Sequence, residues 1–242
     1  QGSAHTGNPT PTRIAGLSNV RTVVSSISHA IALKNDGTVW QWGDTYANSE
    51  HVDWNLSSPV QVPGLDDVIS ITASEIFDYN YALKADGSLW AWGQNFDGQL
   101  GDGTTETRSI PVQVAGLSNV TSVVSGTAST YALQADGSLW AWGGNRSGQL
   151  GDGTTVNRPL PAKVAGLSNV TSLVATSATS VYALQADGSL WAWGSNSKGQ
   201  LGEGTYQNRS TPVQVLPNQT VTSITAGGGT AFAIVRQLTP PT

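Results

Sequence analysis

Histidines and acidic side chains are the residues of this 242-residue chain whose chemistry could serve catalysis or metal binding. Glu50, His51 and Asp53 lie close together in sequence, so they could share a proton or a metal ion. Their spacing matches no known metal-ligand signature. His5 lies in an expected tail. His29 lies in an expected strand, where we expect a packed and hydrogen-bonded ring.

Regularly placed aspartates raise a second chemical possibility, a calcium site. The block Gly-Gln-Leu-Gly-Asp-Gly-Thr-Thr occurs at 98–105 and at 148–155. It lacks the alternating carboxylates and the distal bidentate Glu of calcium loops, so a turn packed against the fold is favoured. Four further aspartates each precede a glycine, which is typical of hairpin turns and not of a catalytic pair. They are Asp36, Asp86, Asp136 and Asp187.

The chain carries no recognisable motif for a nucleophile, a nucleotide or a zinc ion. Neither Gly-x-Ser-x-Gly nor a Walker loop occurs. Cysteine is absent, which excludes disulfides, thiolate metal sites and a cysteine nucleophile. The sequence therefore predicts a protein that is not an enzyme, with no catalytic residue, no metal site and no cofactor.

The charge content is low. Charged residues make up 11% of the chain and the formal net charge is −5, with eleven Lys and Arg and no basic run. A nucleic-acid partner is disfavoured, because phosphate neutralisation supplies most of the affinity of such binders. No apolar run approaches the roughly 20 residues of a membrane span, so we expect no membrane insertion.

The same nine residues recur along the chain. "ADGSLWAWG" occurs at 85–93, 135–143 and 186–194, and a looser copy, "NDGTVWQWG", occurs at 35–43. A second block, "AGLSNV", ends at Val20, Val120 and Val170. A period of about 50 residues indicates a repeat architecture.

Within a unit, every local signal indicates a strand. The expected strands are "VTSVVS" at 120–125, "TYALQ" at 130–134, "SLWAWG" at 138–143 and, as an edge strand, "PVQV" at 111–114. The Asp-Gly pair closes a tight hairpin between the second and third of these segments. Trp140 and Trp142 are two residues apart, so both project from one face of the sheet.

One short sheet cannot bury both of its faces, but copies stacked around an axis can, because each sheet packs on its neighbour. The paired tryptophans are the expected packing surface between successive sheets. Each buried Trp removes about 150–250 Å² from water. We therefore interpret the tryptophan pairs as structural rather than as a stacking surface for a ligand.

The segment "ALKADGSLWAWGQNFDGQLGDGT" at 82–104 and its two later copies resemble the regulator-of-chromosome-condensation repeat family. The resemblance covers about Pro11–Val235. It implies β-propeller blades of four antiparallel strands, and the best-known members have seven blades. In that family some members activate a small GTPase by nucleotide exchange and bind chromatin. Bacterial relatives include a secreted β-lactamase inhibitor and many extracellular repeat proteins.

The number of units differs from seven. Four complete units precede "VTSITAGGGTAFAIV" at 221–235, which supplies two strands of a fifth sheet, and "PTRIAGL" at 11–17 is similar to an outer strand. We predict an all-β propeller of five blades, closed by the N- and C-terminal strands. The alternative is an open arc or a fragment of a longer propeller. The predicted parts are a tail at 1–10, the propeller at 11–236 and a Pro/Thr linker at 237–242.

Binding residues are expected where the copies diverge, because shared residues hold the fold and variable loops bind. The divergent stretches are Asp44–Pro59, expected to be a loop, and Ser74–Tyr81; single aromatic residues also enter the Gly-rich loops. Exposed aromatics favour protein or sugar contacts. The alternative is that they fill gaps at an irregular end of the ring. The candidates are Tyr46, His51, Trp54, Phe77, Tyr79, Phe96 and Tyr206.

These features predict a non-enzymatic protein-binding or scaffolding module of a secreted or surface bacterial protein, located outside the cell. The alternative is a carbohydrate-binding or adhesive module beside a secreted enzyme. The partner is thus a protein or a glycan, and the chain is a monomer or associates through open blade edges. An exchange factor is disfavoured, because the family precedent uses a complete, larger propeller.

Overall fold

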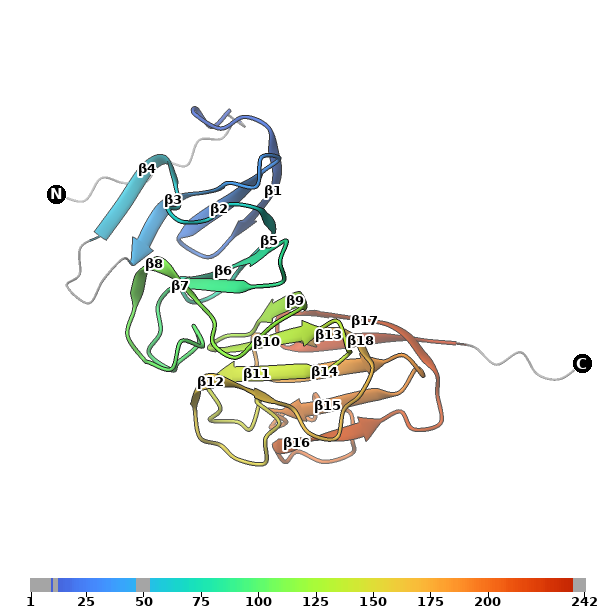
Figure 1. Cartoon of the computed structure of the whole chain (residues 1–242). Coiled ribbons are helices and arrows are strands. Elements are labelled where there is room, and N and C mark those ends of the chain that lie inside the picture. The colour runs from blue at the N-terminus through green and yellow to red at the C-terminus, as the bar shows by residue number, and fades with distance from the viewer. Residues whose placement is uncertain (1–9, 11–12, 47–52, 237–242) are drawn as a thin grey trace, which may run out of the picture.

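The computed structural model describes residues 10, 13–46 and 53–236, and eighteen β-strands form within them. These strands build five antiparallel sheets, four with four strands and one with two. The sheets follow one another in a curved array, from the blue first sheet to the red fifth sheet (Figure 1). The predicted all-β fold of repeated sheets is confirmed. Most of the expected tail at 1–10, and the expected linker at 237–242, lie outside the described residues.

Each four-stranded sheet is a meander in which strands that are consecutive in sequence also pair in space. The first sheet contains β1 (Val20–Ser25), β2 (His29–Lys34), β3 (Val39–Tyr46) and β4 (Asp53–Gln61). The second contains β5 (Val68–Ala73), β6 (Tyr79–Lys84), β7 (Leu89–Gly93) and β8 (Arg108–Gln113).

The remaining sheets repeat this order until the last one, which stops after two strands. The third contains β9 (Val120–Ser125), β10 (Ser129–Gln134), β11 (Leu139–Gly143) and β12 (Arg158–Lys163). The fourth contains β13 (Val170–Ala175), β14 (Ser180–Gln185), β15 (Leu190–Gly194) and β16 (Arg209–Val215). The fifth contains β17 (Val221–Gly227) and β18 (Thr230–Val235).

The Asp-Gly turns set the register of each central hairpin. In the third sheet Gly137 has a φ of +76°, and the Asp136 carboxylate accepts a hydrogen bond from the Ser138 N–H at 2.9 Å. Glycine adopts a positive φ at little cost, so the chain reverses here. The resulting register places Trp142 opposite Thr130 in the neighbouring strand.

A glycine ends the third strand of the second, third and fourth sheets, and Gly43 takes the corresponding place inside β3; at each of these glycines the pairing with the fourth strand shifts register. Gly143 has a φ of +94°, and a Cβ placed on it would collide with the Ala128 carbonyl oxygen. Any other residue at position 143 would have a strained backbone, because φ is positive, and its Cβ would clash with the Ala128 carbonyl oxygen. Glycine is therefore required at this position by two independent constraints.

The second tryptophan of each later pair fills the boundary with the preceding sheet. Trp142 of the third sheet is fully buried against Leu89 and Ala91 of the second sheet. Trp92 and Trp193 are buried in the same way at the adjoining boundaries. The first tryptophan of these pairs is half-buried and packs at the margin of the same cluster. The predicted packing role is confirmed.

The predicted closure of the ring is wrong, and the alternative of an open arc describes the observed fold. The fifth sheet packs against β13 and β14 of the fourth sheet. Residues 13–17, part of the expected closing strand, form no strand and lead into β1 at the far end of the array (Figure 1). Among the described strands β18 pairs with β17 alone, so no strand from the N-terminal end joins the fifth sheet.

The stretch Asp44–Pro59 was expected to be a loop, but its described residues, 44–46 and 53–59, lie in two paired strands. β3 extends to Tyr46 and β4 begins at Asp53, with Asp44 opposite Asn55. Thr, Tyr, Val and Trp in this stretch favour strands, so the pairing continues where other units turn into a Gly-rich loop.

Candidate interaction surface at the loop rim

Two kinds of connection between strands lie at one edge of the array: the links between the first and second strands, and the links between the third and fourth strands. In an antiparallel meander the link between the first and second strands lies at the same end as the link between the third and fourth. We call this edge the loop rim. It consists of the short links 26–28, 74–78, 126–128, 176–179 and 228–229, and of the Gly-rich loops 94–107, 144–157 and 195–208.

Backbone hydrogen bonds hold each Gly-rich loop beside the short link of its own sheet. The Gln94 N–H donates to the Asp78 carbonyl at 2.8 Å. The Gly144 N–H donates to the Ala128 carbonyl at 2.8 Å, and the same bond recurs in the fourth sheet. The loops of the rim are therefore fixed relative to the sheets that carry them.

His29 links the rims of the first two sheets. Its Nδ1 lies 3.0 Å from Asp78 Oδ1 and its Nε2 lies 2.8 Å from Asn80 Oδ1. The Ser28 hydroxyl donates to the same Asp78 oxygen at 2.6 Å. Burial alone would raise the pKa of Asp78, but hydrogen bonds from His29, Ser28 and Ser26 outweigh it and lower that pKa. The expected packed and hydrogen-bonded His29 is confirmed.

Tyr79 is fully buried, so the expectation that it lies on an exposed loop is wrong. It begins β6, and its hydroxyl donates to the Gly126 carbonyl at 2.7 Å in the next sheet. Burial raises the pKa of Tyr79, which keeps the phenol neutral. Its ring packs edge-on against Tyr81. The strand alternation carries this ring into the boundary between sheets rather than into solvent.

The Gly-rich loops are turns tied to the next sheet. Asn95 Nδ2 donates to the Thr104 carbonyl at 3.0 Å, and the Leu100 N–H donates to Asn95 Oδ1 at 2.9 Å. The Asp102 carboxylate is paired with Arg108 at 2.8 Å. The Gly103 N–H donates to the Pro159 carbonyl of β12 at 2.9 Å. The predicted turn packed against the fold is confirmed for this loop.

Large apolar side chains are exposed on the loop rim. Phe96 is 70% exposed and Tyr206 is 74% exposed, as expected for aromatics substituted into Gly-rich loops. Phe77 is half-buried and packs against the cluster between the second and third sheets. Ile27 is 77% exposed, and sequence reasoning missed it. Comparison of the repeats could have found it, because Ile27 stands where the third unit has Thr127.

The other predicted binding residues cannot be placed on this surface. His51 lies outside the described residues, together with Glu50. The backbones of Tyr46 and Trp54 belong to β3 and β4, and their side chains are outside the described part of the structure.

A small depression lies between the short links of the second, third and fourth sheets. It has a volume of about 40 Å³ and polar and apolar walls, among them Glu75, Ile76, Thr127 and Ser177. The Thr127 hydroxyl donates to the Ser177 carbonyl at 2.9 Å, which links the short connections of the third and fourth sheets beside the depression. A depression of this size suits one small side chain of a partner.

Among residues 10, 13–46 and 53–236, no three His, Cys, Asp or Glu side chains gather in a way that could hold a metal ion. Within the same residues, we find no helix with the length and apolar character needed to span a membrane.

The repeated sheets, the Trp boundaries and the Gly-rich loops match a known family. The model of the RCC1-like domain matches residues 1–233, nearly the whole chain. The chain belongs to the RCC1-like domain family. A search of curated proteins found no match for this RCC1-like domain.

Solved structures place the RCC1-like domain among β-propellers. It is similar to yeast RCC1 (Prp20), crystallised with Kap60, with a TM-score of 0.77 and 21% identity over 96% of this chain. It is also similar to human WBSCR16, with a TM-score of 0.73 and 22% identity over 93% of this chain. The RCC1-like domain spans 57% and 60% of these two chains. At this identity the likeness establishes the fold.

Proposed function

We propose that this RCC1-like domain is a non-enzymatic protein-binding module that recognises its partner through the loop rim. The observation that carries the proposal is the exposure of Ile27, Phe96 and Tyr206 on loops whose backbones are hydrogen-bonded in place. Large apolar side chains on a fixed support lose little conformational entropy on binding, and aromatics are enriched among the residues that dominate interface energetics.

The polar groups near these side chains are engaged within the fold. Asp78 and His29 bind each other, and Asp102 pairs with Arg108. We therefore assign these groups to positioning of the loops rather than to chemistry on a substrate.

Similar proteins support a polypeptide partner. Yeast Prp20 has been crystallised with Kap60, and a second structure of Prp20p is described with its binding to Gsp1p and histones. Because the net charge of this chain is −5, we expect a protein partner rather than a nucleic acid. The carbohydrate alternative gains no support from Tyr79, which is buried.

We also propose an extracellular location, supported by the neutral, hydroxyl-rich composition. Fractionation of the native host with an antibody against this domain tests the proposal. Detection only in the cytosolic fraction would contradict it.

A matched pair of variants tests the binding surface. The rim variant combines Ile27→Ser, Phe96→Ala and Tyr206→Ala, and the control combines Ile110→Ser and Val60→Ser on the outer strands β8 and β4. The partner is first purified with the wild-type domain, and its affinity is then measured by calorimetry. We expect the rim variant to bind at least about tenfold more weakly and the control to bind normally. Equal affinity of the rim variant and the wild type would overturn the proposal.

A further inference from the structure

The depression on the loop rim lies among three short links of unequal length. The links of the second, third and fourth sheets consist of residues 74–78, 126–128 and 176–179. The shortest link stands between two longer ones, which leaves a hollow of about 40 Å³ above it. Glu75 and Ile76 line this hollow on one side and Ser177 lines it on the other.

The fourth link is held in an unusual backbone conformation. Thr179 has a φ of +61°, whereas a β-branched residue strongly prefers a negative φ. Two hydrogen bonds fix it, because the Thr179 N–H donates to the Thr176 carbonyl and the Ser195 N–H donates to the Thr179 carbonyl, both at 3.1 Å. Strain of this kind persists where the surroundings over-determine it, and it concentrates at binding sites. The fold therefore holds this wall of the depression in place.

Five hydrogen-bond donors of the lining are used within the fold. The Thr127 hydroxyl donates to the Ser177 carbonyl at 2.9 Å, and the Ser125 hydroxyl donates to a backbone carbonyl of the second sheet at 3.0 Å. The backbone N–H groups of Gly126, Thr176 and Ser177 donate to carbonyl oxygens at 2.7, 2.9 and 3.0 Å. The lining thus offers mainly oxygen lone pairs, and a group that enters must supply its own hydrogens.

Glu75 gives the depression a negative charge. Its side chain is exposed and forms no ion pair among the described residues. The short links contain one other charged residue, Asp78, which His29 and two serines engage. None of these links, all of which lie within the described residues, contains Lys or Arg. A cation therefore complements this part of the rim, because no fixed positive charge repels it.

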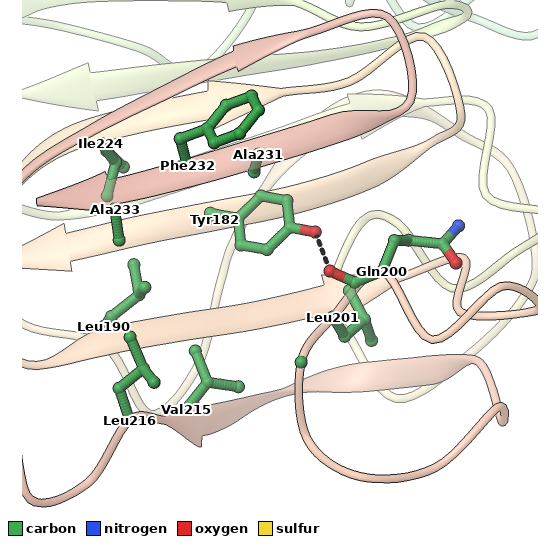
Figure 2. A pocket seen from close by; sticks show the side chains of 11 residues that line it. Tyr182, Leu190, Gln200, Leu201, Val215, Leu216, Ile224, Ala231, Phe232 and Ala233 are labelled. Carbon is green, nitrogen blue, oxygen red and sulfur yellow. Dashed lines mark hydrogen bonds between the residues drawn. The ribbon is translucent and has the colours of Figure 1, made fainter.

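A second pocket, of about 150 Å³, differs in its chemistry. It lies between the fourth and fifth sheets, and its walls are mostly aliphatic, with Leu201 and Ala231 among them (Figure 2). The Tyr182 hydroxyl donates to the Gln200 carbonyl at 2.5 Å, and the described lining contains no charged side chain. This pocket has nothing that selects a cation, so it serves as an internal reference for a cationic probe.

We propose that the depression on the loop rim receives the ammonium group of a lysine from the protein partner. An ammonium group is compact and carries three donors, which matches a small hollow lined by lone pairs and one carboxylate. The aliphatic stem of the lysine lies along Ile76, which is 40% exposed. A guanidinium group is larger and planar, so it fits this volume less well. The inference rests on the proposed function, which supplies the partner.

The probe is the Nα-acetyl N-methylamide of lysine, titrated into the isotope-labelled intact domain and followed by amide shifts in NMR spectra. We expect saturable shifts at Glu75, Thr127 and Ser177, with a dissociation constant on the order of a millimolar for a ligand of this size. The corresponding amide of norleucine lacks the ammonium group and should bind at least about fivefold more weakly. Equal affinity of the two amides, or equal shifts at Leu201 and Ala231, would overturn the proposal.

A matched pair of variants tests the charge. Glu75→Gln keeps the shape of the side chain and should weaken binding of the lysine amide at least about threefold. Glu106→Gln makes the same change at an exposed residue in the Gly-rich loop of the same sheet, and should leave the affinity unchanged. Added sodium chloride should weaken binding to the wild type, because salt screens an exposed ion pair. Unchanged affinity in Glu75→Gln would refute the role of this carboxylate.

The proposed function and this inference fail separately. If the rim variant of Ile27, Phe96 and Tyr206 keeps its partner while the lysine amide binds at the depression, the proposed binding surface is wrong and the lysine site stands. If the rim variant loses its partner while the lysine amide produces no shifts in the wild type, the lysine site is overturned and the proposed function stands.

Discussion

The indole nitrogen of Trp142 donates a hydrogen bond to the backbone carbonyl of Gln99 at 2.7 Å, across the boundary between the second and third sheets. The same carbonyl also accepts from the Tyr81 hydroxyl, and Tyr81 meets Trp142 edge-on with ring centroids 6.1 Å apart. One buried tryptophan therefore satisfies its own polar atom and fixes the Gly-rich loop of the preceding sheet.

Replacing Trp142 by alanine should destabilise the domain strongly. The change removes a fully buried ring and leaves a cavity, so we expect a loss of about 3–5 kcal/mol in the free energy of unfolding. Urea unfolding followed by circular dichroism measures it. Tyr206→Ala, at an exposed residue, is the control and should change that free energy by less than about 0.5 kcal/mol. Similar losses in both variants would contradict the packing role of Trp142.

Replacing Gly143 by alanine should cost more than the same change at Gly166. Both residues have a positive φ, which costs a non-glycine residue about 1–2 kcal/mol. Gly166 faces open space, whereas a Cβ at Gly143 collides with the Ala128 carbonyl. The melting temperatures of the two variants are compared. Gly166→Ala introduces backbone strain alone, whereas Gly143→Ala introduces backbone strain and a steric clash. Equal melting temperatures would show that the loop moves freely away.

Replacing Asn145 by alanine should detach a Gly-rich loop from its sheet. Asn145 is fully buried, and it accepts from the Leu150 N–H at 2.9 Å and donates to the Thr154 carbonyl at 3.1 Å. Leaving these buried groups unpaired costs about 1–3 kcal/mol each. Hydrogen exchange should become faster at the Leu150 amide, and unchanged exchange there would be evidence against this role. Ser197→Ala, in the corresponding loop of the fourth sheet, is the exposed control.

Acid should weaken the link between the first two sheets. The pKa of Asp78 is lowered in the folded state, so its ionised form stabilises the fold above the unfolded pKa of about 3.9. That contribution is lost as the pH falls through the lower, folded pKa. The difference in melting temperature between the wild type and Asp78→Asn should thus be large at pH 7 and shrink below about pH 4.

The exposed Asp66 provides the control for this pH profile. Its pKa is also lowered, by Lys84, but the pair lies at the surface, where ion pairs contribute little. Asp66→Asn should therefore change the melting temperature only slightly at any pH. If the difference in melting temperature between the wild type and Asp78→Asn does not change with pH, the charge of the Asp78 carboxylate does not stabilise the fold.

The sequence by itself determined the repeated unit. Asp-Gly pairs, the spacing of Trp140 and Trp142, and the terminal glycine predicted a hairpin with one tryptophan-bearing face, because turn chemistry and strand alternation act over a few residues. The exposure of Phe96 and Tyr206 was also predictable, since each interrupts an otherwise constant polar loop.

Only the tertiary structure decided which side chains are buried between sheets and whether the ring closes. Both depend on contacts between residues about one repeat apart in the sequence. Tyr79 is buried because the third sheet stands against it, and the ring is open because no described strand from the N-terminal end pairs with β18. Burial and closure are relations between whole sheets. They follow from which surfaces meet in space, and no local pattern in the chain specifies them.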